Sequence, residues 1–193
     1  KNATKHKKIF LFLISFFFYI DGVYTIIDMA TAYGTSLGLN TTGLLLALLL
    51  TQIVAFPASL TFAVLSKTKN TASLIKIAII AYFLISLFAV QLDKQWEFWV
   101  LAVAVGCFQG GIQALSRSYF AKIIPENASG EYFGLFDICG KGASFLGTML
   151  IGVVTQITGK QNLGVAALSI MFVIGYLIFN KVSKMDDQKR LYK

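Results

Sequence analysis

Residues 9–35 read IFLFLISFFFYIDGVYTIIDMATAYGT, and within this apolar run only Asp21 and Asp28 carry charge. A helix needs about 20 apolar residues to cross the hydrocarbon core of a bilayer, so the run is long enough for one span. The basic residues before it imitate the start of a signal peptide. The run is too long for the hydrophobic part of such a peptide, however, so we interpret it as a retained membrane span.

Five further apolar stretches follow, and short connections with turn or breaker residues separate them. None shows the strict alternation of a transmembrane β-strand. Because lipid offers no partner to backbone polar groups, helices are the structure that remains. The sequence therefore predicts an all-α membrane protein with six transmembrane helices. The five further stretches are Gly43–Leu65, Ala72–Leu92, Phe98–Ile124, Tyr132–Thr158 and Leu163–Asn180.

The composition also indicates a membrane protein. Of the 193 residues, 56% are hydrophobic and 13% are charged, whereas soluble domains are about 45–50% apolar and about 25% charged. We divide the chain into a basic cytoplasmic tail, a six-helix bundle and a C-terminal cytoplasmic tail, at residues 1–8, 9–180 and 181–193. The two cysteines lie far apart within apolar runs, so we expect no disulfide, metal or cofactor.

The basic residues are unevenly distributed between the two ends of the spans. Lys94 and Lys160 fall on one side and Lys141 lies within a span, while the other 14 of the 17 Lys and Arg residues fall on the side of both termini. Cytoplasmic loops carry such an excess, so both termini are predicted to be cytoplasmic. In a bacterium the membrane would be the plasma membrane. The net charge of +8 thus reflects membrane topology, and we expect no nucleic-acid partner.

The six stretches differ in polarity in a repeating order. The third and sixth contain almost no polar side chain, which is typical of helices at the lipid, whereas the first, second, fourth and fifth carry polar stripes. An inverted repeat of three plus three helices would give this order. If this six-helix bundle stood alone, it would expose its polar stripes to lipid. We therefore expect a homodimer, or a complex with an N-terminal half, that meets through the four polar helices.

Asp21 and Asp28 stand seven residues apart and so share one face of the first predicted helix. Asp21 falls near the membrane midplane, where an ionised acid costs about 2.5–3.5 kcal/mol. Two interpretations remain open. Either packing against a neighbouring helix satisfies the acid, or the acid is a proton or substrate-amine site on an aqueous cavity. Asp28 lies nearer the outer surface, where the free-energy cost of an ionised side chain is lower.

Charged and amide side chains form stripes on the other polar stretches. Asp137 and Lys141 are four residues apart with the acid first, the favoured order for an ion pair within a helix. We predict that they pair, either permanently or as a pair that breaks during transport. If the two are not coupled, they point to different partners, and Asp137 would then face Arg117. Arg117 reaches a depth similar to that of Asp137 and can also serve as a cytoplasmic anchor. The amides predicted to hydrogen-bond a solute, or else to join helices, are Gln52, Gln109 and Gln113.

Three stretches carry a resemblance to a known family. Residues 16–27, FFFYIDGVYTII, look like the seventh helix of the vacuole-effluxer-like branch of the major facilitator superfamily. Residues 109–119, QGGIQALSRSY, are similar to its tenth helix, and residues 130–141, GEYFGLFDICGK, resemble its eleventh. The resemblance covers essentially the whole chain but only the C-terminal six of the family's twelve helices. It implies one half of a secondary transporter that works by alternating access.

The resemblance also implies a substrate class, because the yeast members export amino acids from the vacuole. The residues alone indicate a small polar solute that is cationic or zwitterionic, with the proton as a candidate coupling ion. One departure concerns the superfamily's cytoplasmic loop pattern, G-x-x-x-D-[RK]-x-G. It would fall on residues 63–70, where Lys67 replaces the acid and Thr68 the base, so the usual contact of that loop is in doubt.

Two other classes of function fit parts of the pattern. An intramembrane aspartyl protease would use Asp21 and Asp137 on separate helices. The GxGD sequence around a second catalytic acid is missing, however, and Lys141 would disturb a proton-sharing pair. A non-transporting receptor or assembly factor would need neither a central water-filled cavity nor stabilisation by a solute. We therefore expect a transporter and not an enzyme.

Overall fold

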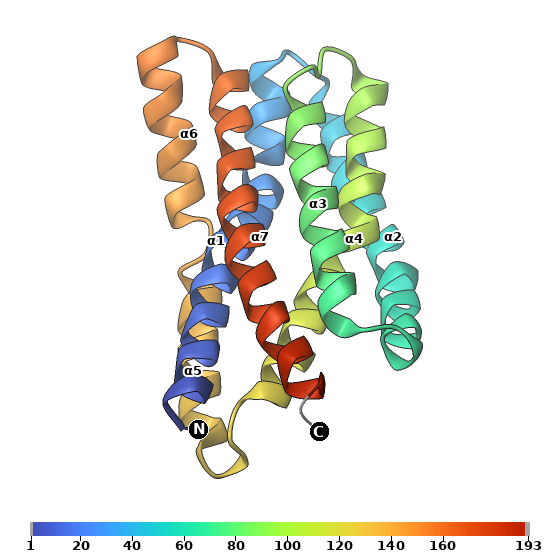
Figure 1. Cartoon of the computed structure of the whole chain (residues 1–193). Coiled ribbons are helices and arrows are strands. Elements are labelled where there is room, and N and C mark those ends of the chain that lie inside the picture. Colours follow the sequence, from blue (N-terminus) through green and yellow to red (C-terminus); the bar gives the residue numbers. More distant parts are fainter. Residues whose placement is uncertain (1, 192–193) are drawn as a thin grey trace.

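The computed structural model describes the backbone of residues 2–191 and the side chains of residues 6–185, and over the described backbone it contains helices and no strand. Six helical segments are long and apolar enough to cross a membrane, which confirms the predicted all-α membrane fold. The helices run roughly side by side, and both chain ends lie at the same end of the bundle (Figure 1).

The helices extend past the apolar stretches at both ends of the chain. The first helix begins at Asn2 rather than Ile9, and the last ends at Leu191 rather than Asn180, because helical backbone continues through the polar residues beyond each apolar run. The elements are α1 (Asn2–Ser36), α2 (Thr41–Thr68), α3 (Thr71–Ala89), α4 (Gln95–Ile123), η1 (Glu126–Ala128), α5 (Ser129–Lys141), α6 (Phe145–Thr158) and α7 (Gln161–Leu191).

The fifth predicted span is not one continuous helix. It was predicted over Tyr132–Thr158, but α5 ends at Lys141 and α6 begins at Phe145. Ser144, between them, has a φ of 73°, a left-handed conformation that an α-helix does not accommodate. Gly140 and Gly142 weaken the helix just before this point, since glycine has a low helix propensity. The span is therefore made of two half-helices, α5 and α6, which lie one above the other in Figure 1.

The helix packing repeats between the first three spans and the last three. α1 packs on α7 as α4 packs on α3, and α2 packs on α4 as α5 and α6 pack on α1. α3 and α7 pack on each other. If the first three spans are exchanged with the last three, each of these contacts becomes its counterpart in the other group. An inverted repeat requires this relation. The broken fifth span, α5 and α6, thus occupies in the last group of three spans the position that α2 occupies in the first group.

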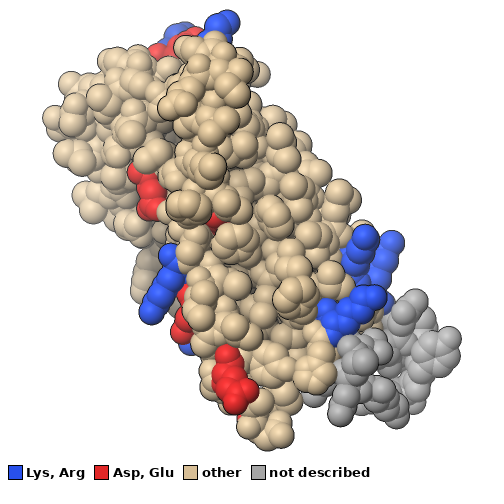
Figure 2. Space-filling view, turned by 90° about the vertical axis from the view of Figure 1, so that its left-hand side faces the viewer, with Lys and Arg blue, Asp and Glu red and all other residues tan. Residues whose placement is uncertain are grey.

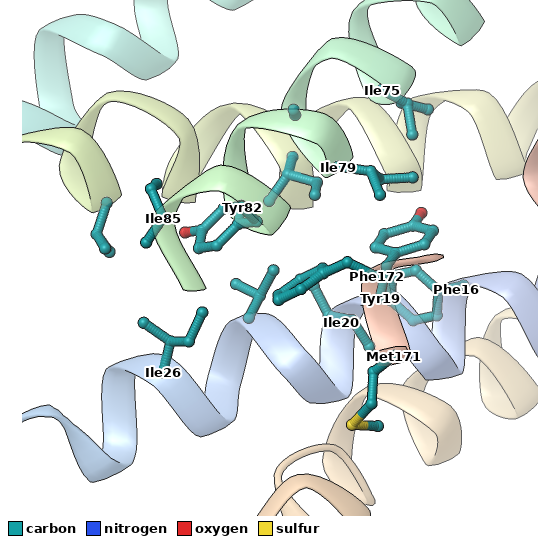
Figure 3. Close-up of a cluster of buried hydrophobic side chains, with 14 of the residues drawn as sticks. Phe16, Tyr19, Ile20, Ile26, Ile75, Ile79, Tyr82, Ile85, Met171 and Phe172 are labelled. Carbon is teal, nitrogen blue, oxygen red and sulfur yellow. The ribbon is translucent and has the colours of Figure 1, made fainter. Parts of the chain in front are cut away.

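The apolar core joins α1, α3 and α7. Tyr82 of α3 stacks on Phe172 of α7 with ring centroids 5.8 Å apart, and Tyr19 of α1 belongs to the same cluster (Figure 3). Half of the apolar window of α3 is buried within the protein, against 17% in α2. The third and sixth spans were predicted to lie at the lipid, but they also form the centre of the bundle. Their lack of polar side chains therefore reflects burial on one face as well as an apolar outer face.

Glycines let α2 and α4 approach each other closely. A Cβ atom on Gly106 would lie 2.7 Å from the carbonyl oxygen of Thr51, and one on Gly110 would also meet α2. Two small residues four positions apart on one helix are typical of such an approach. Gly130 and Gly134 share the spacing but not the contact, because within the described part of the chain nothing lies within 4 Å of a Cβ atom placed there.

Candidate functional site

A cavity of about 440 Å³ lies between α1, α4 and α5. Its volume falls within the range of about 300–1,000 Å³ that is usual for small-molecule sites. The residues that line it include aromatic and aliphatic side chains as well as charged and amide groups. Its lining therefore combines apolar surface with a few polar groups, as ligand sites usually do. The lining residues are Phe16, Ile20, Tyr24, Gln113, Ala114, Arg117, Phe136, Asp137, Gly140 and Lys141.

Helical spacing brings the polar groups of this cavity together. Gln113 and Arg117 are four residues apart on α4, and Asp137 and Lys141 are four apart on α5, so each pair lies on one face of its helix. The two faces meet at the cavity, and α1 contributes Tyr24. Four of the eight predicted site residues thus line one cavity.

Asp137 pairs with a cation on the neighbouring helix. Arg117 Nη1 lies 3.6 Å from Asp137 Oδ1. The Arg117 guanidinium also lies 5.1 Å from the centre of the Phe133 ring, which helps to orient it. The two side chains of the pair are 61% and 50% exposed, so the pair lies where the cavity opens at the surface of this chain.

The predicted ion pair between Asp137 and Lys141 is absent from the described side chains, because Asp137 turns toward α4 instead. Lys141 is the last residue of α5, where an ammonium group is favoured by the negative end of the helix dipole. It has no acidic partner among residues 6–185. The cavity is therefore lined by two cations and one acid, a balance that favours a solute with a carboxylate group.

Lys141 also lines a second and more open cavity, a surface depression of about 730 Å³, together with the residues of the helix break, Gly142, Ala143 and Ser144. The side chain thus stands at the junction of the two cavities. Its position depends on where α5 ends, and so on the break. Charged side chains gather at the two ends of the face shown in Figure 2, and a few lie along one edge between them, on a surface that is otherwise largely uncharged.

Asp21 does not line either cavity and is fully buried, with 0% exposure. Its carboxylate accepts hydrogen bonds from the backbone N–H groups of Leu146, at 3.1 Å, and Gly147, at 2.7 Å. The Thr25 hydroxyl donates a third, at 3.3 Å. These contacts match the first interpretation of the sequence, an acid satisfied by a neighbouring helix. The partners are backbone groups of α6, which the sequence pattern did not indicate.

The remaining predicted residues lie outside the cavity between α1, α4 and α5. Asp28 is exposed on α1. Gln52 lines a separate cavity of about 40 Å³ between α1, α2 and α4, which is too small for a solute. Gln109 is half-buried on α4, and its Oε1 has no hydrogen-bond partner among the described residues. These three side chains are therefore not part of the site formed by Gln113, Arg117, Asp137 and Lys141.

Sequence reasoning missed the helix break and the aromatic residues that line the cavity. The Phe16 and Phe136 rings stack at 4.1 Å, and this contact joins α1 to α5 beside the polar groups. Gly140 and Gly142 were a usable signal for the break, since two glycines in three residues are unusual inside a helix. The aromatic residues gave no such signal, because phenylalanine is common throughout the chain.

Known proteins match this chain over almost its full length. The family model described as "Vacuole effluxer Atg22 like" matches residues 1–190. The chain is 44% identical over 178 residues to the "Uncharacterized MFS-type transporter YxiO" of Bacillus subtilis, with 92% of this chain and 42% of that protein covered. It is 30% identical over 204 residues to "Autophagy-related protein 22" of Candida glabrata, with 98% and 37% covered. The chain thus spans less than half the length of these curated relatives.

Proposed function

Because the chain belongs to the vacuole effluxer Atg22-like family, we propose that it is the C-terminal half of a secondary transporter for a small zwitterionic solute of the amino-acid class. The observation that carries the proposal is the cavity between α1, α4 and α5, with its two cations, one acid and one amide. The relative from Bacillus subtilis is named as an MFS-type transporter, which also supports the proposal.

Each group of an amino-acid-like solute has a matching group in the cavity. Lys141, which has no acidic partner among the described side chains, can take the solute carboxylate. Asp137 can take the ammonium group, and Gln113 can donate to or accept from either end. The rings of Phe16 and Phe136 offer apolar surface to the solute side chain. The Arg117–Asp137 pair is exposed enough to rearrange when a solute enters.

Transport by alternating access needs a second half on the open side of the cavity. Arg117 and Asp137 are at least half exposed on this chain, and a partner half would cover them. That half is either an N-terminal six-helix unit or a second copy of this chain, related by an axis along the membrane normal. We refer to the resulting complex as the assembled transporter. We propose further that it is driven by a proton gradient and, in a bacterium, lies in the plasma membrane.

The orientation is part of the same proposal, with both termini in the cytoplasm. Lys69, in the α2–α3 connection, and Lys160, in the α6–α7 connection, are both exposed and lie in connections at opposite ends of the spans. A membrane-impermeant thiol reagent applied from outside the cell should label a Lys160→Cys variant and spare Lys69→Cys. The two positions serve as each other's control after both native cysteines have been replaced. If Lys69→Cys is labelled and Lys160→Cys is not, the protein has the opposite orientation, with both termini outside.

Two observations weigh against the alternative functions. Asp21 binds the backbone of α6 and Asp137 binds Arg117, so the two acids do not form the carboxylate pair that an aspartyl protease needs. A receptor or assembly factor would not require a solute-sized cavity lined by charged groups, whereas this chain has one. A transporter accounts for both features.

Substitution of Lys141 tests the proposed function. In the assembled transporter, Lys141→Gln should weaken the binding of a neutral amino acid about 10- to 100-fold, because a charge-assisted hydrogen bond contributes roughly 1.5–3 kcal/mol. Lys141→Arg should retain most of the affinity. Binding of the corresponding amino-acid amide, which lacks the carboxylate, should be weak in the wild type and unchanged in Lys141→Gln. Equilibrium binding of labelled solute to the purified protein measures the two variants and the amide.

The control for this experiment is Lys160→Gln, an exposed lysine at the other end of the bundle from the tails. It should bind the solute as the wild type does. If Lys141→Gln also binds like the wild type, Lys141 does not take the carboxylate and the proposed site is wrong.

A further inference from the structure

The start of α6 is bound by a side chain from another helix. The first N–H groups of an α-helix have no partner within the helix, and in lipid each unsatisfied group is costly. Leu146 and Gly147, in the first turn of α6, donate theirs to the two carboxylate oxygens of Asp21 on α1. A carboxylate is well suited to this place, because the positive end of the helix dipole lies there.

The contact between α1 and α6 leaves no space for adjustment. A Cβ atom on Gly147 would lie 2.8 Å from Asp21 Oδ1 and would also collide with Thr25. Gly147 is therefore required for α6 to reach the carboxylate. Just before it, Ser144 has the left-handed φ of 73° that separates α5 from α6. The strained residue, the glycine and the buried acid thus belong to one local arrangement.

Among the described residues, the carboxylate of Asp21 is stabilised by hydrogen-bond donors and not by a cation. No described Lys or Arg forms an ion pair with it, and its three donors are two backbone N–H groups and the Thr25 hydroxyl. If the fifth span were a continuous helix, Leu146 and Gly147 would donate to their own helix instead. Asp21 therefore stabilises the broken form of the span relative to the continuous form.

We propose that Asp21 is a positioning residue that holds the fifth span in its broken form and thereby keeps Lys141 at the cavity. The inference rests on the proposed function for the role of Lys141. The link is direct in the chain: α5 ends at Lys141, and α6 begins four residues later, at Phe145. Without the Asp21 contact, α6 is free to shift against α1, and the end of α5 with its lysine shifts as well.

The test follows α6 and solute binding in the same variants of the assembled transporter. Spin labels at Ala32, near the end of α1, and at Thr158, at the end of α6, report the distance between the two helices. The wild type should give one narrow distance distribution. Asp21→Leu, which removes every acceptor, should broaden or shift it and weaken solute binding at least tenfold. Asp21→Asn retains one carbonyl oxygen and should rescue both measurements in part.

Ser15→Ala is the matched control. Ser15 is also buried on α1, and its hydroxyl donates to the carbonyl oxygen of Gly175 on α7 at 2.7 Å. Its loss removes a buried interhelical hydrogen bond between α1 and α7 that involves no residue of the break. Thermal stability should fall, while the distance between Ala32 and Thr158 and the solute affinity stay as in the wild type.

Gly147→Ala provides a second route if Asp21→Leu does not fold. It keeps the carboxylate but forces α6 away from α1, so it should broaden the same distance distribution and weaken binding. Narrow, wild-type distances in the variant that folds would overturn the proposal, whether or not binding changes. If the distances change as expected while Lys141→Gln binds solute normally, the positioning role stands and the proposed solute site falls.

Discussion

Phe12→Ala is expected to lower the free energy of unfolding by about 3 kcal/mol. The side chain is fully buried on α1, and its ring lies 5.3 Å from that of Tyr119 and 5.4 Å from that of Phe120. The Phe179 ring of α7 is 6.1 Å away. Phenylalanine-to-alanine changes in protein cores cost about 3–5 kcal/mol. The lower end applies here, because between helices in lipid the cost is mainly lost packing and not transfer from water.

The matched control for this prediction is Phe10→Ala. Phe10 lies two residues away on the same helix, but it is 65% exposed. Its replacement should change the free energy of unfolding by no more than about 0.5 kcal/mol. Unfolding of the assembled transporter in mixed detergent micelles, followed by circular dichroism, measures both variants. Equal losses for Phe10 and Phe12 would contradict the packing of α1 against α4 and α7.

The spans could be predicted from the sequence because the signal is length and hydrophobicity. Six apolar stretches gave six membrane-length helical segments. Their outer ends could not be predicted, since the helix at Asn2 and at Leu191 continues through polar residues that carry no such signal. The break at Ser144 was missed for a related reason. It interrupts the helix inside a stretch that is long enough for one span, and the two nearby glycines were the signal for it.

The partners of charged residues were harder to predict than their positions. Spacing along one helix suggested Asp137 with Lys141, but Asp137 pairs with Arg117 on α4, which depends on how α4 and α5 cross. The midplane depth of Asp21 was a sound reason to single it out. Its partners are backbone N–H groups of α6, and these become available only because the span is broken. In both cases, tertiary contacts that spacing along one helix cannot reveal decide the arrangement.

We propose that the cavity between α1, α4 and α5 holds the solute and that the balance of charges in its lining governs solute binding. Asp137→Lys replaces the acid with a third cation beside Arg117 and Lys141. The new cation would stand where the acid is proposed to take the solute ammonium group. Like charges brought together cost several kcal/mol, so solute uptake should fall by about 100-fold or more. The double variant Arg117→Asp with Asp137→Arg restores the pair in reverse.

The initial rate of uptake of a labelled neutral amino acid by the assembled transporter in proteoliposomes tests this role of the cavity. The wild type, the Asp137→Lys variant and the reversed pair are compared at equal protein content. We expect near-complete loss of uptake in Asp137→Lys and recovery to within about tenfold of the wild type in the reversed pair, since opposite charges again face each other. Uptake by Asp137→Lys at the wild-type rate would show that the charge balance of the cavity does not govern transport.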